Sequence, residues 1–142
     1  MARTAVTVTT LTAETVVADT AGVSLDATNG HVISCSGIPI EHLAIRIVNT
    51  TASQKAATVL AGDDPPAFEA GLGSVTVTCA AATVDTYYLT QAVDATSIDI
   101  TTPVVKWISG LSSARHSQSD GTINVDVESG MTGTITAFRI PR

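Results

Sequence analysis

The sequence predicts a single all-β domain, either a β-sandwich, a jelly roll or a small barrel, and three observations support this. Thr, Val and Ile supply 50 of the 142 residues, and β-branched side chains favour pleated strands over helices. Apolar and hydroxyl-bearing residues alternate from end to end, with turn residues between the runs, which is typical of half-buried strands. Helix formers are scarce, with 4 Glu, 2 Lys, 3 Gln and 7 Leu. A helix bundle is therefore excluded, and the length fits one domain.

Short apolar or alternating runs at a spacing of about ten residues define the expected strands of a sandwich or barrel. These runs are residues 6–9, 31–35, 43–48, 56–60, 75–79, 84–90, 97–101, 104–109, 122–127 and 133–140. Their apolar faces predict a core. The side chains expected to be largely buried are Val6, Val8, Leu43, Ile45, Ile47, Val75, Val77, Trp107, Ile123, Val125 and Phe138. Residues 13–21 are compatible with either a helical turn or a strand.

The connections between these runs carry turn chemistry. Asn29-Gly30, Asp120-Gly121 and Ser129-Gly130 are dipeptides that tolerate positive φ, so they predict tight hairpin turns. Residues 62–71 form a longer loop, because the Pro65-Pro66 pair cannot lie in a central strand.

The domain organisation expected is a short N-terminal segment followed by the β domain. Residues 1–28 are rich in Thr and Ala with few large side chains, so they predict an edge strand or an arm that extends onto a neighbour. Residues 29–142 are expected to form the sandwich or barrel domain.

The charge of the chain indicates which partners it can bind, and its apolar runs and cysteines indicate its compartment. Lys plus Arg is 7 against 13 Asp plus Glu, for a net charge of −6, so binding to nucleic acid is not expected and a basic partner surface is favoured. No apolar run is long enough to span a bilayer, and the Thr-rich N-terminus is a poor secretory segment, so we expect a soluble, unprocessed chain. Without an oxidising compartment, Cys35 and Cys79 are expected to be reduced and buried.

Candidate catalytic and metal-binding residues are present but are not in the spacing that such chemistry needs. Residues 115–120 bring Arg, His, Ser and Asp together, but along an expected strand, whereas catalytic triads assemble from distant segments. The three histidines lack ligand spacing, and the acidic residues lack a calcium-loop pattern. The residues of metal-binding type are His31, His42, His116, Asp63, Asp64, Asp94, Asp99, Asp126 and Glu128. No catalytic, cofactor or metal site is expected.

The sequence also lacks the pattern of two common kinds of binding site. Gly71-Leu72-Gly73 is not a phosphate loop, because no GK[ST] ending and no helix follow it. A sugar-binding face needs several exposed rings, and most of the aromatic side chains are expected in the core. The rings available are Phe68, Tyr87, Tyr88, Trp107 and Phe138.

The composition favours association instead of catalysis. Charged residues make up only 14% of the chain and the mean hydropathy is +0.32, which is unusually apolar for a monomer of this size. Such a surface suits a chain that buries part of itself against its own copies or against a host assembly.

Three stretches carry a resemblance to a known family. They are residues 47–53 leading to 61–67, residues 113–121, and the tail 125–141. Together they span about the last two-thirds of the chain, and they resemble a family of small β-rich decoration, or cement, proteins encoded among bacteriophage head genes. Residues 82–112 form a longer segment than the family's minimal pattern.

The resemblance implies a function without an active site. Decoration proteins of this kind sit as homotrimers on the outer surface of the virion capsid, bind the major capsid protein and brace the head, without cofactor, nucleic acid or membrane. Residues 1–28 are expected to contribute to that clamp. The alternatives are a phage tail or head–tail joining protein, and a carbohydrate-binding attachment module that exposes Trp107 or the Tyr87-Tyr88 pair.

Overall fold

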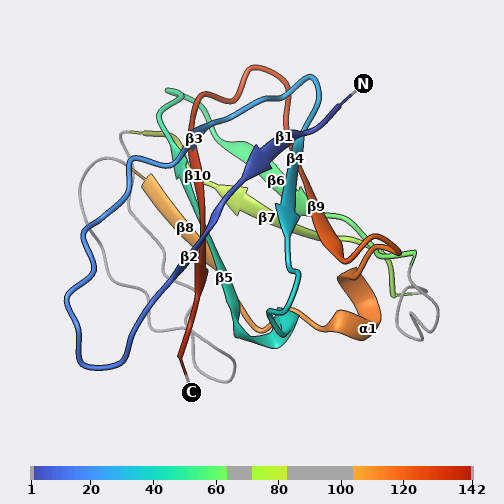
Figure 1. Cartoon of the computed structure of the whole chain (residues 1–142). Coiled ribbons are helices and arrows are strands. Elements are labelled where there is room, and N and C mark those ends of the chain that lie inside the picture. Colours follow the sequence, from blue (N-terminus) through green and yellow to red (C-terminus); the bar gives the residue numbers. More distant parts are fainter. Residues whose placement is uncertain (1, 64–71, 83–103, 142) are drawn as a thin grey trace.

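The chain folds into two β-sheets packed face to face (Figure 1). The computed structural model describes residues 2–63, 72–82 and 104–141. The first sheet has the order β1 (Thr4–Val6), β4 (His31–Ser34), β9 (Thr122–Val127), β6 (Lys55–Val59) and β7 (Val75–Cys79). The second has the order β2 (Val8–Thr10), β10 (Gly133–Arg139), β5 (Leu43–Asn49) and β8 (Val104–Ile108), and β3 (Val23–Ser24) also pairs with β10. The expected all-β class is confirmed, as a sandwich.

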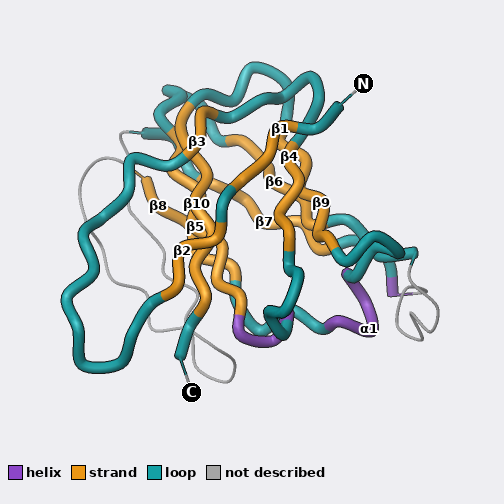
Figure 2. The backbone as a smooth tube through the Cα atoms, in the orientation of Figure 1, coloured by secondary structure: helices purple, strands orange, loops and turns teal. Residues whose placement is uncertain are grey.

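Most of the described strand pairs are antiparallel, and the two parallel pairs both involve the N-terminal segment. β1 runs parallel to β4, and β2 runs parallel to β10. Two short helices, η1 (Ile40–His42) and α1 (Ser113–His116), lie at the same end of the sandwich (Figure 2). They are joined by Glu41, whose carboxylate accepts hydrogen bonds from the backbone N–H and the hydroxyl of Ser113, at 3.0 and 2.7 Å.

Seven of the ten expected strands agree with the structure, and the runs 84–90 and 97–101 lie outside the described residues. The expected strand 6–9 is wrong in one respect. The chain divides into β1 and β2 around Thr7, and the two halves join different sheets. Residues 13–21 form neither a helix nor a strand; they belong to an irregular loop with a turn at residues 13–14.

The expected hairpin turns are also corrected. Gly30, Gly121 and Gly130 do have positive φ, at 68°, 74° and 75°, but none of them connects two strands that pair with each other. The turn at Gly30 leads from β3 to β4, and that at Gly130 leads from β9 to β10, so each passes between sheets. The turn at Gly121 joins α1 to β9. These tight turns connect one sheet to the other. The same turn residues would also suit a hairpin, so the local sequence cannot tell the two kinds of connection apart.

The hydrophobic core fills the space between the sheets, and most of the residues expected there are buried. Those found buried there are Val6, Leu43, Ile45, Ile47, Val77, Ile123 and Val125. Phe138 is also buried, but it lies beside Arg46 and Trp107 on the other face of the second sheet, outside this core. Val8, Val75 and Trp107 are only half-buried, so the prediction was wrong for them. Val8 lies at the outer edge of the second sheet and Val75 begins the last described strand of the first. Trp107 pairs with Arg46, on the face of β5 opposite to the buried Ile45 and Ile47.

No helix in the described part of the chain is long and apolar enough to cross a membrane.

Candidate interaction surface at the sheet crossover

The N-terminal segment is an edge strand of both sheets at once. Thr4 pairs with His31 in the first sheet, and Val8 pairs with Ala137 in the second. Between them, Thr7 is exposed where the chain passes from one sheet to the other (Figure 1). Val6 is 3% exposed and belongs to the core, so it anchors the crossing. Residues 4–10 thereby connect the two layers along one side of the sandwich.

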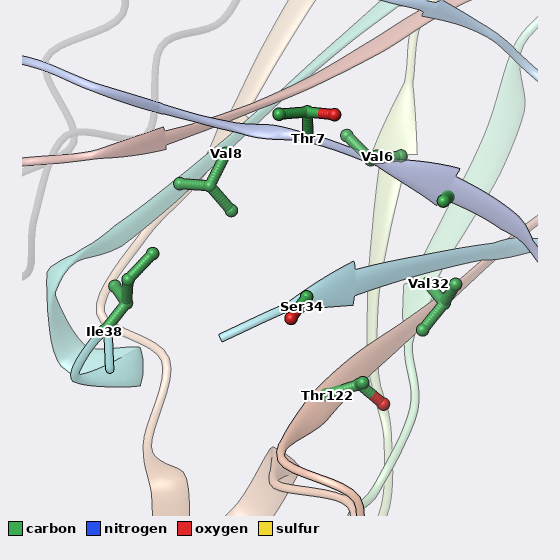
Figure 3. A pocket seen from close by; sticks show the side chains of 8 residues that line it. Val6, Thr7, Val8, Val32, Ser34, Ile38 and Thr122 are labelled. Atoms are coloured by element: carbon green, nitrogen blue, oxygen red, sulfur yellow. The ribbon is translucent and has the colours of Figure 1, made fainter. Parts of the chain in front are cut away.

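A groove with a volume of about 460 Å³ lies beside this crossing (Figure 3). Its lining comes from the crossing segment, from β4, from the approach to η1 and from the start of β9. The lining residues are Ala5, Val6, Thr7, Val8, Val32, Ser34, Ile38 and Thr122. Val8 and Ile38 lie toward one end of the groove, and Val32 and Thr122 toward the other (Figure 3).

The chemistry of the groove suits packing and hydrogen bonding. Its lining consists of aliphatic side chains and three hydroxyls, those of Thr7, Ser34 and Thr122, without an ionisable group. Such a surface offers neither a general acid nor a general base. The pairing of β1 with β4 ends at Ile33, so within the described residues Ser34 has no partner strand on that side. An extended peptide could continue the sheet there while placing an apolar side chain in the groove.

A second hollow of about 300 Å³ lies by the same crossing, on the side of the second sheet. Its lining is Val6, Thr7, Thr9, Thr20, Gly22, Val23, Ile135 and Thr136, again without an ionisable side chain. The exposed crossing is therefore associated with two uncharged hollows, and together they are the candidate interaction surface.

A tight turn built on Asp26 fixes the start of the crossing segment. Its carboxylate accepts hydrogen bonds from the backbone N–H groups of Thr28 and Asn29, both at 3.0 Å, and from the Asn29 side chain at 2.9 Å. The Thr4 hydroxyl also donates to it, at 2.9 Å. The Asn29 backbone, the Asn29 side chain and Thr4 hold the pKa of Asp26 well below its usual value of 3.8.

A buried histidine supports the same turn. His31 is 0% exposed, and its Nε2 accepts a hydrogen bond from the backbone N–H of Asp26 at 3.0 Å. Burial is the main cause that lowers the pKa of His31 below 6.5. Arg3 lies over the turn, where its guanidinium contacts Asp126 at 2.5 Å. The N-terminal strand is thus held by polar contacts at its start and by Val6 at its end.

The Arg-His-Ser-Asp cluster of residues 115–120 is placed differently from the prediction. His116 ends α1 rather than lying in a strand, because the chain turns here to connect the two sheets. Its side chain is buried, and Nδ1 lies 3.0 Å from the carbonyl oxygen of Leu60. Ser117 donates to the carbonyl of Gln118 at 3.4 Å, and Asp120 accepts from Thr122 at 2.6 Å. These contacts stabilise the helix and the following turn.

The structure distributes the candidate metal ligands among separate elements. His31, His42 and His116 belong to β4, η1 and α1 respectively. Asp126 contacts Arg3, and Glu128 contacts Lys55 at 3.2 Å. Among the described residues, no group of three or more His, Cys, Asp or Glu side chains could hold a metal ion. Asp64, Asp94 and Asp99 lie outside the described residues, as does Gly71 of the glycine motif.

Both cysteines are free and buried, as the sequence predicts. Burial raises the pKa of the Cys35 and Cys79 thiols to about 11. Of the aromatic residues, Phe138 is buried and Trp107 is half-buried beside it, with 5.5 Å between the ring centroids. Phe68, Tyr87 and Tyr88 lie outside the described residues.

Comparison of the chain with protein-family models, with curated proteins and with solved structures gave no match. The fold and the surface therefore carry the functional argument. The sequence predicts a turn at Asn29-Gly30 but not two other parts of this surface, the groove residue Ile38 and the Asp26 carboxylate that caps the turn. An Asp three residues before Asn-Gly is a signal for a side-chain-capped turn and could have indicated the second. The groove has no local signal, because residues far apart in the chain form it.

Proposed function

We propose that this chain is a non-enzymatic bacteriophage virion protein that binds the outer capsid surface and stabilises the head. The observation that carries the proposal is the pair of uncharged hollows beside the crossing segment of residues 4–10. Contacts at such hollows are individually weak, but a symmetric shell repeats them many times and multivalency adds them. The low charge content and the resemblance of residues 47–53, 61–67, 113–121 and 125–141 to decoration proteins support the same function.

The proposed partner is the major capsid protein, and the proposed assembly is a homotrimer. An extended segment of the partner would lie along the free part of the β4 edge near Ser34, with an apolar side chain between Val8 and Ile38. The net charge of −6 favours a basic patch on that partner.

The first test is the copy number of this chain in purified particles of the phage that encodes it, measured by quantitative mass spectrometry. A copy number comparable to that of the major capsid protein is expected. A few copies per particle would indicate a tail or head–tail joining protein. Absence from particles would contradict a virion function and favour a carbohydrate-binding module, which glycan binding would then test.

The second test concerns the groove itself. Ile38→Asp places a charge in the lining, so we expect the variant to bind particles more weakly. Val16→Asp is the matched control, because Val16 is 98% exposed and lies on the loop between β2 and β3, outside the groove. Circular dichroism establishes that both variants fold. Equal binding of the two folded variants would exclude the groove as the capsid contact.

Deletion is too disruptive to test whether residues 1–28 act as a clamp. Removal of these residues would also remove β1, β2 and β3, together with the core side chain of Val6. Thr7→Arg instead changes an exposed position at the crossing. If the segment contributes to trimer formation or capsid binding, this variant weakens one of them, as measured by analytical ultracentrifugation and by particle binding. A variant that retains both would exclude the clamp.

A further inference from the structure

We propose that His31 and Asp26 form an acid-sensitive latch that holds the N-terminal strand β1 on the first sheet. The latch consists of the turn at residues 26–30 and the ring of His31 beneath it, and it is independent of the identity of any partner. Its central contact is the hydrogen bond from the backbone N–H of Asp26 to Nε2 of His31, at 3.0 Å. The ring is 0% exposed, so water cannot replace this contact without local opening.

The turn holds β1 through Thr4. The hydroxyl of Thr4 donates to the Asp26 carboxylate at 2.9 Å, and the backbone N–H of Thr4 donates to the carbonyl of Gly30 at 3.0 Å. The turn is closed by the N–H of Gly30, which donates to the carbonyl of Asp26 at 2.9 Å. Gly30 has a φ of 68°, a backbone conformation that glycine adopts without strain and that other residues rarely adopt. A displacement of Asp26 would therefore break the contact of the Thr4 hydroxyl directly, and it would loosen the backbone contact of Thr4 by opening the turn at Gly30.

The protonation state of His31 decides whether this arrangement is possible. A neutral imidazole that accepts at Nε2 carries its proton on Nδ1. Protonation would place a second N–H donor against the N–H of Asp26, with no acceptor between them. The protonated ring could not keep the contact, so either the ring or the turn would have to move. In both cases the support beneath Thr4 is lost.

The charges around the ring come from three segments. Asp26 of the turn and Asp126 of β9 favour the protonated ring, whereas Arg3 before β1 disfavours it. The backbone of Thr4 in β1 also favours the protonated form, but burial outweighs these effects and lowers the pKa of His31 below 6.5. As the pH falls below 6.5, the open form binds the proton first. The ratio of open to latched molecules then rises about tenfold for each unit by which the pH falls, until the pH reaches the pKa of His31 in the latched form.

Opening is expected to remain local. β1 is a three-residue edge strand, and short edge strands lie at the low-stability end of a fold. β4 stays paired with β9 on its other side, from His31 to Ser34. The latch would therefore release the start of β1 around Thr4, while Val6 stays in the core and the sandwich stays folded.

Amide hydrogen exchange measured by NMR between about pH 7 and about pH 5 tests the latch. The reporter is the backbone N–H of Thr4, which donates a hydrogen bond to the carbonyl of Gly30. The reference is the backbone N–H of Leu60, which donates to the carbonyl of Asn124 at 2.9 Å. After correction for intrinsic exchange, the opening constant of Thr4 should rise by up to about tenfold per pH unit below 6.5, with little change at Leu60. Equal changes at both amides would overturn the proposal, because opening would then be global.

A pair of matched variants separates His31 from other titrating groups. His31→Gln keeps a hydrogen-bond acceptor that cannot titrate, so it should remove most of the pH dependence at Thr4. His42→Gln makes the same change in η1 and should retain the wild-type dependence. If His31→Gln does not fold, the test is instead the ¹⁵N chemical shift of His31 Nε2, measured against pH in the wild-type chain. Titration of that nitrogen should coincide with Thr4 opening, and titration without opening would overturn the latch.

Discussion

The guanidinium carbon of Arg46 lies 5.9 Å from the centroid of the Trp107 ring. It also lies 5.6 Å from the centroid of the Phe138 ring, so one cation contacts two adjacent aromatic side chains. The same guanidinium contacts the Asp19 carboxylate at 2.6 Å and donates to the Thr20 carbonyl at 3.0 Å. Arg46 therefore ties the loop between β2 and β3 to the outward face of the second sheet.

Trp107→Ala should destabilise the protein by about 2 kcal/mol. The ring is half-buried, so its loss should cost less than the roughly 3 to 5 kcal/mol typical of a fully buried aromatic residue. The cost comes from the contact with Phe138 and the cation–π contact with Arg46, as well as lost burial. Urea unfolding measures it, and Trp107→Phe should recover more than half. A variant as stable as the parent would show that these ring contacts contribute nothing.

Gly133→Ala should destabilise the protein by about 3 kcal/mol or more, or prevent folding. Gly133 has a φ of 137°, and a Cβ there would lie 1.9 Å from the carbonyl oxygen of Val48. Gly37→Ala is the matched control, because its φ is 71° and nothing lies within 4 Å of the added Cβ. It should cost only the backbone strain, about 1 to 2 kcal/mol. Similar costs in thermal unfolding would indicate that the strand pair β5–β10 can shift to admit a methyl group.

Strand positions could be predicted from the sequence because alternation is a local consequence of one buried face. Val77 and Cys79 in β7, and Ile123 and Val125 in β9, are buried as that pattern requires. Pairing could not be predicted in the same way, since it depends on residues far along the chain. The run from Val6 onward has the alternation of one strand, but its two halves bind different sheets.

The candidate interaction surface was less accessible to sequence reasoning than the strands. The groove is formed by three separated parts of the chain, around Thr7, Ile38 and Thr122. The burial of His31 depends on a backbone N–H five residues earlier, which no side-chain pattern reveals. Composition predicts association, and a candidate location for it could be named only once the fold was known.

Cys35 and Cys79 should react with a thiol reagent only when the protein unfolds. Both thiols are buried, and burial raises their pKa to about 11. At about pH 8 the reactive thiolate is therefore rare in the folded state. Labelling with a chromogenic disulfide should be slow in buffer and rapid for both thiols in concentrated urea. Rapid labelling of either cysteine in buffer would contradict its buried position.

Asp26→Asn should lower the free energy of unfolding at neutral pH. It should also make that free energy decrease less as the pH falls into the acid range. Hydrogen bonds from Asn29 and Thr4 lower the pKa of Asp26 below 3.8 in the folded state. The unfolded state therefore binds the proton first, so this contribution is complete well above pH 3.8 and is lost as the pH falls below that value. Asp63→Asn removes one negative charge from a loop outside the turn and serves as the control.

Urea midpoints of wild type and both variants from about pH 7 to about pH 2 give the measurement. His31 acts in a different range, because its pKa is lowered from 6.5 rather than from 3.8. The contribution of His31 is expected to decrease as the pH falls below 6.5, and it should persist in Asp26→Asn if the backbone N–H of residue 26 still donates to the ring. The further loss below 3.8 should be reduced in Asp26→Asn and retained in Asp63→Asn. An acid profile unchanged by Asp26→Asn would mean that the carboxylate does not stabilise the turn that holds Thr4.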